Sequence, residues 1–77
     1  MSIIPLAFLP EGSSGIVYNV AGGRGLQKRL AELGILPNIE VKVVKSAGNG
    51  PVLIITKGSR IALGRGVSMK ILVRRIM

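Results

Sequence analysis

Short segments rich in valine, isoleucine and leucine run through this 77-residue chain, and glycine, proline or asparagine separates each from the next. β-branched side chains pack well on a pleated surface, so these segments favour strands. A domain this short buries only about 60% of the surface that its unfolded chain exposes, so its core must be dense in apolar residues. Hydrophobic residues make up 48% of the chain. We therefore expect one mainly β domain over residues 1–77.

Alternating polarity predicts which face of each strand meets the core. The segment 16–20 predicts a strand, because Ile16, Tyr18 and Val20 alternate with Val17 and Asn19. We expect the first three of these residues, Ile16, Tyr18 and Val20, to face the core. Further strands are predicted where Ile39, Val41 and Val43 alternate with polar residues, in the apolar run Val52 to Ile55, and at Met69, Ile71 and Val73.

The apolar run Val52 to Ile55 has no polar position, which is consistent with a central strand covered on both faces. Gly58 and Ser59 follow as a two-residue hairpin signal, which would pair Thr56 with Ile61. Five or six short strands in so short a chain predict a small closed or nearly closed barrel, because closure removes exposed strand edges.

In one segment the apolar residues recur with the spacing of a helix and not with that of a strand. Leu26, Leu30 and Leu33 are spaced i, i+4 and i+7, which predicts a short amphipathic helix over 25–33 with the three leucines in the core. Gly34 stands at the natural left-handed stop. No Ser, Thr, Asp or Asn caps the start, so we expect tertiary packing to hold the helix.

The chain has few of the residue types that catalysis usually requires. The chain has no histidine and no cysteine, and its only acids are Glu11, Glu32 and Glu40, far apart in sequence. Imidazole bases, disulfides and thiolate metal sites are thereby excluded. A carboxylate-only iron or magnesium site has weak support. We expect no enzymatic activity, no cofactor and no metal site.

The net charge of +8 indicates an anionic partner: nucleic acid, a membrane surface or an acidic protein. It also fits a surface that keeps an apolar domain soluble. Proteins that bind single-stranded nucleic acid stack bases on aromatic side chains, and this chain has only Phe8 and Tyr18. Nucleic-acid binding therefore stays an alternative.

The glycine-rich stretch 22–25 leads into the predicted helix, where backbone N–H groups can hold phosphate. It matches neither the dinucleotide fingerprint nor the P-loop, so a tight turn is the favoured interpretation. The apolar stretch Ile3 to Leu9 lacks the basic start of a signal peptide, and no run approaches the ~20 residues of a membrane-spanning helix. We expect a cytoplasmic protein.

Several short motifs stand in an order typical of one family. They are L-A-F-L-P-E-G-S-S-G at 6–15, Gly22-Gly23, R-L-A-E-L-G-I at 29–35, Pro37-Asn38, Gly50-Pro51, I-A-L at 61–63 and K-I-L-V at 70–73. The segment R-L-x-E-L-G-I-x-P is the most specific. Along nearly its whole length the chain resembles the ferrous iron transport protein A (FeoA) family.

This resemblance implies an SH3-like β-barrel carrying one short helix. It also implies a small cytoplasmic protein that assists FeoB, the membrane ferrous iron transporter with a cytosolic GTP-binding domain. A related barrel forms the C-terminal domain of iron-dependent repressors, so a stand-alone relative of that domain is an alternative. Direct iron ligation is not expected, since ferrous iron favours imidazole and carboxylate ligands. The oligomeric state stays open.

Two positions depart from the family pattern. Asn38 stands where the family usually has glycine, and asparagine also tolerates the left-handed geometry of such a turn. The arginine that usually follows I-A-L is replaced by Gly64, with Arg65 one step later. The role of that arginine is therefore left unassigned.

Five residues are candidates for partner contact. Arg24, Arg29 and Asn38 lie on the predicted helix and its flanking turns, where a regulatory contact with FeoB is expected. Arg74 and Arg75 would approach anionic lipid at the inner face of the membrane, or form a solvated tail. Arg24 is also a candidate arginine finger that assists GTP hydrolysis in trans.

Overall fold

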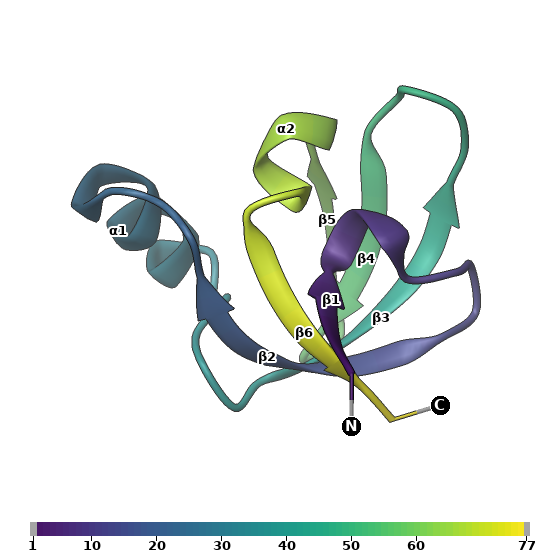
Figure 1. Cartoon of the computed structure of the whole chain (residues 1–77), viewed down its shortest axis with the longest axis horizontal. Coiled ribbons are helices and arrows are strands. Elements are labelled where there is room, and N and C mark those ends of the chain that lie inside the picture. The colour runs from purple at the N-terminus through teal and green to yellow at the C-terminus, as the bar shows by residue number, and fades with distance from the viewer. Residues whose placement is uncertain (1, 77) are drawn as a thin grey trace.

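Six of the apolar segments form one curved antiparallel sheet around the core, as predicted (Figure 1). The computed structural model describes residues 2–76. The strands are β1 (Ile3–Pro5), β2 (Ser14–Val20), β3 (Glu40–Ser46), β4 (Val52–Thr56), β5 (Ser59–Leu63) and β6 (Ile71–Arg75). They lie in the order β1-β6-β2-β3-β4-β5, which leaves β1 and β5 at the two edges.

Three helical segments connect the strands. They are the 3-10 turn η1 (Leu6–Phe8), helix α1 (Arg24–Glu32) and the short helix α2 (Arg65–Ser68). Helix α1 is the predicted one, whereas α2 was not predicted from the sequence. Figure 1 shows α1 set apart from η1 and α2, beyond the end of β2.

The core is aliphatic and almost completely closed to solvent. Strand pairing brings inward-facing residues of neighbouring strands together, such as Val17 with Val73 and Val43 with Ile54. All four are fully buried, as are Leu6 and Ile71. At about 25 cal/mol per Å² of apolar area, this burial drives folding of the small domain.

The predicted inward face of β2 is wrong at Tyr18. The register with β6 shifts there, because Val17 pairs with Val73 while Asn19 already pairs with Leu72. The extra residue of such a bulge disrupts simple alternation, so Val17 and Val20 both face the core. Tyr18 is instead 59% exposed.

The predicted β4–β5 register is also wrong. Thr56 pairs with Ser59, and the turn residues are Lys57 and Gly58 with φ of 51° and 78°. Two positive φ values are those of a type I′ turn, whose twist matches that of the flanking strands. Ile61 therefore pairs with Ile54 instead of Thr56.

Several side chains are more exposed than the sequence pattern suggested. Leu33 is 47% exposed at the end of α1, so only Leu30 and, in part, Leu26 pack into the core. Met69 lies before β6 and is 40% exposed. In β4 every second residue is only half-buried, so the strand is not fully covered on both faces.

Arg65 ties together three segments at one end of the barrel. Its Nε donates to Gly50 O at 3.1 Å, and its Nη1 donates to Ala7 O at 3.3 Å and to Ser46 Oγ at 3.2 Å. Arg65 follows β5 and Ala7 follows β1, so this side chain links the segments beyond the two edge strands. Its Nη2 is buried without a hydrogen-bond partner among residues 2–76.

Candidate partner-binding surface

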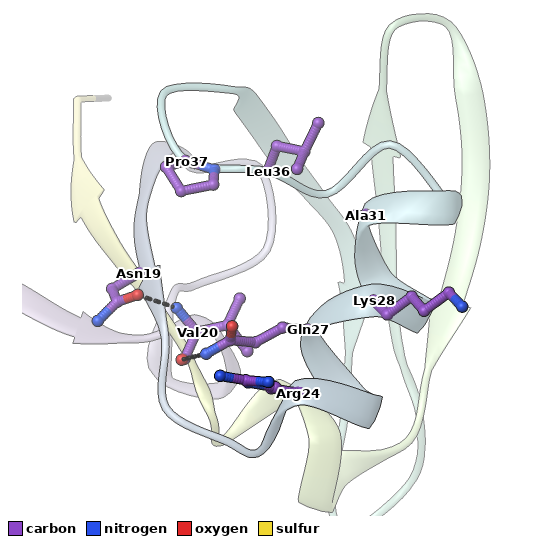
Figure 2. A pocket seen from close by; sticks show the side chains of 8 residues that line it. All are labelled: Asn19, Val20, Arg24, Gln27, Lys28, Ala31, Leu36 and Pro37. Carbon is purple, nitrogen blue, oxygen red and sulfur yellow. Dashed lines mark hydrogen bonds between the residues drawn. The ribbon is translucent and has the colours of Figure 1, made fainter.

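A groove of about 350 Å³ separates α1 from the end of β2 and from the turn that follows the helix (Figure 2). We call it the α1 groove. Its lining includes Arg24, Gln27, Lys28 and Ala31 from the helix, Val20 from β2 and Leu36 from the turn.

The start of α1 is held without a capping side chain. Gly23 occupies the N-cap position, and no side chain bonds there, as the sequence predicted. Gln27 instead ties the helix to the preceding segment, donating from Nε2 to Val20 O at 3.3 Å and to Gly22 O at 3.1 Å (Figure 2 shows the first of these bonds). A Cβ at Gly22 would lie 2.8 Å from Leu26 Cδ2, so a larger residue in this turn would require the Leu26 side chain to shift.

The end of α1 is a Schellman motif, which explains the most specific motif in the sequence. Gly34 has φ of 90°, and its N–H donates to Ala31 O at 2.9 Å. The N–H of Ile35 donates to Leu30 O at 2.8 Å, and both side chains are buried. Such a motif satisfies helix-end carbonyls with one left-handed glycine, so the predicted role of Gly34 is confirmed.

The next turn places the far wall of the groove. Ile39 N donates to Leu36 O at 3.2 Å, and Asn38 has φ of 74°, as its sequence position predicted. Asn38 N also donates to Val17 O at 2.7 Å, which fixes the turn on β2. Leu36 and Pro37 are thereby held opposite α1.

The α1 groove combines apolar walls with a basic rim. Leu36 is 43% exposed, and Val20 and Ala31 contribute buried or half-buried aliphatic surface. Arg24 and Lys28 are exposed, and no acidic residue lines the groove. An aliphatic side chain flanked by carboxylates would satisfy both parts of this surface.

The five sequence-predicted contact residues do not form one surface. Arg24 lines the α1 groove, while Arg29 lies on the same helix outside the lining. Asn38 and Arg74 both line a small hollow of about 40 Å³, together with Tyr18. Arg75 ends β6, opposite Gly15.

Sequence reasoning missed two side chains at these sites. Tyr18 was assigned to the core, and no sequence signal marks the bulge that exposes it. Lys28 is not among the five predicted contact residues, yet it lines the groove with Arg24. Their helical spacing of four residues places both on one side of α1 and could have indicated the pair.

Within residues 2–76, no three Asp or Glu side chains come close enough to hold a metal ion. The chain also offers few side chains that could bind a metal ion, since it has neither histidine nor cysteine. No helix in this part of the chain is both long and apolar enough to cross a membrane.

Comparison with known proteins gives consistent results. The family model of the FeoA domain matches residues 4–75. A protein of Methanocaldococcus jannaschii, provisionally named Fe(2+) transport protein A, is 49% identical over 69 residues, covering 90% of this chain and 83% of the relative.

Two solved structures show the same fold at appreciable identity. A crystal structure described as the iron uptake regulatory protein FeoA has a TM-score of 0.90 and 32% identity, covering 99% of this chain and 100% of that one. FeoA of Stenotrophomonas maltophilia, solved with zinc and described as a prokaryotic SH3 domain protein, has a TM-score of 0.78 and 30% identity over 90% of this chain and 87% of that one.

A manganese-dependent transcriptional repressor solved with manganese shares the fold only. Its TM-score is 0.90 at 18% identity, and the match covers 99% of this chain but 38% of the repressor. The match to the family model, the curated relative and the SH3-like fold together show that the chain belongs to the FeoA family.

Proposed function

We propose that this protein is a cytoplasmic accessory protein of ferrous iron uptake, which binds and modulates an FeoB-type membrane transporter with a GTP-binding domain. Family membership supports the transport role, and the relative from Methanocaldococcus jannaschii carries a ferrous iron transport name. The protein acts by binding and not by catalysis, because it has no histidine or cysteine and only three carboxylates.

The α1 groove is the observation that carries this proposal. It offers an apolar pocket beside two cations, which is the combination of anchor site and polar rim that protein interfaces use. The occupant is a segment of the transporter's cytosolic part with an aliphatic anchor and acidic neighbours. Arg24 is the first residue of α1 and is exposed, so its guanidinium is available to a carboxylate or a bound nucleotide of the partner.

Binding of the purified FeoB cytosolic part tests the groove. Arg24→Glu reverses the charge at the rim, and we expect roughly tenfold or greater weakening of the complex by calorimetry. Lys70→Glu makes the same charge change at an exposed residue outside the groove and should bind nearly as the wild type does. Equal weakening by the two variants would show that the groove is not the contact.

GTP hydrolysis by FeoB tests the finer role of Arg24. An arginine finger stabilises charge in the transition state, and lysine cannot reproduce its planar fork. Under this mechanism Arg24→Lys keeps most of the binding but loses the acceleration of hydrolysis. Equal hydrolysis rates with wild type and Arg24→Lys would leave Arg24 as a rim contact only.

A further inference from the structure

The outer face of strands β3, β4 and β5 carries two rows of exposed or half-buried side chains. Strand pairing aligns Lys42 with Ile55 and Arg60 in one row, and Lys45 with Leu53 and Ala62 in the next. Directly paired residues lie on the same face of a sheet, about 5 Å apart. Together with Lys57 in the adjoining turn, these residues form what we call the basic outer face.

A bulge in β3 brings the two lysines to the same side. Lys42 and Lys45 are three residues apart, and simple alternation would place them on opposite faces of the sheet. The register shifts between Val43 and Lys45, so that Val43 pairs with Ile54 and faces the core while Lys45 pairs with Leu53. Both lysines are exposed as a result.

Two shallow hollows flank the aliphatic residues of this face. One, of about 340 Å³, lies between Lys42, Lys57 and Ile55. The other, of about 350 Å³, lies between Lys45, Pro51 and Leu53. Each hollow therefore combines an aliphatic surface with lysine at its border.

We propose that the basic outer face docks onto the surface of an anionic phospholipid bilayer. Four cations, Lys42, Lys45, Lys57 and Arg60, lie on or beside three short neighbouring strands. Lysine can place its ammonium group at phosphate level while its aliphatic stem, with Leu53 and Ile55, contacts the acyl boundary.

The acids near this face do not balance its cations. Glu40 borders the first hollow, and the Glu11 carboxylate accepts a hydrogen bond from Ser46 N at 2.8 Å near the second. Two acids against four cations leave a local excess of positive charge, and the net charge of +8 adds long-range attraction.

The chemistry of this face fits lipid better than nucleic acid. Proteins bind single strands by stacking bases on aromatic side chains, and neither Phe8 nor Tyr18 lies on β3, β4 or β5. Half-buried leucine and isoleucine between the cations contribute nothing to phosphate contacts but suit an acyl boundary. The face also shares no lining residue with the α1 groove, so this proposal stands independently of transporter binding.

Vesicle sedimentation tests the proposal directly. We expect the wild type to bind vesicles of phosphatidylcholine with about one-third phosphatidylglycerol, and to ignore vesicles of phosphatidylcholine alone. The double variant Lys42→Gln with Lys45→Gln should bind roughly 25-fold more weakly, since each basic residue at the surface contributes about fivefold. Higher salt should weaken the wild-type binding.

A matched control separates this face from general charge. Lys28→Gln with Lys70→Gln removes the same charge from exposed residues elsewhere and should bind vesicles within about threefold of the wild type. Equal loss in both double variants, or no binding to anionic vesicles, would overturn the proposal. So would tight binding of a single-stranded oligonucleotide that the Lys42 and Lys45 substitutions abolish.

Transporter binding by the same variants keeps the two proposals distinguishable. The Lys42 and Lys45 variant retains an unchanged α1 groove and should bind the FeoB cytosolic part in solution as the wild type does. Failure of vesicle binding would leave the groove proposal intact, and failure of transporter binding would leave the lipid proposal intact.

Discussion

At the scale of single residues, Arg65 has a role that its sequence position does not reveal. Its guanidinium donates to the carbonyls of Gly50 and Ala7 and to the hydroxyl of Ser46, and so joins segments up to 58 residues apart. The planar fork of arginine suits this task, because several donors leave it in fixed directions. A neutral side chain of similar length would leave those acceptors unpaired.

Arg65→Met should therefore lower the free energy of unfolding by about 2–4 kcal/mol, as expected for the loss of several part-buried charged hydrogen bonds. Arg65→Lys should recover little of it, since a single ammonium cannot reach all three acceptors. Urea denaturation gives the values. Arg60→Met, at an exposed position of β5, is the control, and an equal effect there would contradict a specific role for Arg65.

At the scale of elements, tight turns and bulges decide which residues face the core. The β4–β5 hairpin uses Lys57 at a positive φ of 51°, where asparagine or glycine would be more favourable. The bulges in β2 and β3 each add one residue to a strand and change its inward face. Because only local backbone geometry changes, the sheet order is unaffected.

Lys57→Asn should stabilise the protein by about 0.5–1 kcal/mol, because Asn-Gly is the preferred pair for a type I′ turn. Lys57→Val should destabilise it by a similar or larger amount, since β-branched residues avoid positive φ. Thermal unfolding of both variants measures the two shifts. If they had the same sign, the turn would not have the assigned geometry.

At the scale of the whole molecule, charge opposes the compact state. Eleven basic residues and three acids share a domain with a radius of gyration of 10.9 Å. Like charges at such distances repel one another, and salt screens the repulsion over a Debye length of about 10 Å at 0.1 M. The apolar core has to outweigh this repulsion.

Raising NaCl from about 20 mM to about 200 mM should therefore increase the free energy of unfolding, by roughly 0.5–1 kcal/mol. A fold held together by surface ion pairs would show the opposite change, because salt weakens ion pairs and so lowers the free energy of unfolding. Urea unfolding at several salt concentrations measures the slope. Lys28→Gln with Lys70→Gln should show a smaller slope, and a fall in stability with salt would contradict the argument.

Much of the fold and part of the site could be predicted from the residues alone. The sequence pattern correctly predicted the helix that contains Leu30, its end at Gly34 and the turn at Asn38, because each depends on local backbone preferences. Three predictions were wrong: that Tyr18 faces inward, that Ile61 pairs with Thr56, and that Leu33 lies in the core. Each of these three depends on a bulge, a turn type or a neighbour that sequence periodicity does not contain.

The sequence by itself determined a mainly β domain with one amphipathic helix and an excess of positive charge, because these follow from composition and short-range periodicity. Only the tertiary structure decided where the positive charge gathers. Arg24 and Lys28 flank a groove because the turn at Leu36 folds back towards α1. Lys42 and Lys45 share a face because the pairing of β3 with β4 accommodates one extra residue in β3. This bulge depends on the neighbouring strand, so the sequence of β3 alone does not predict it.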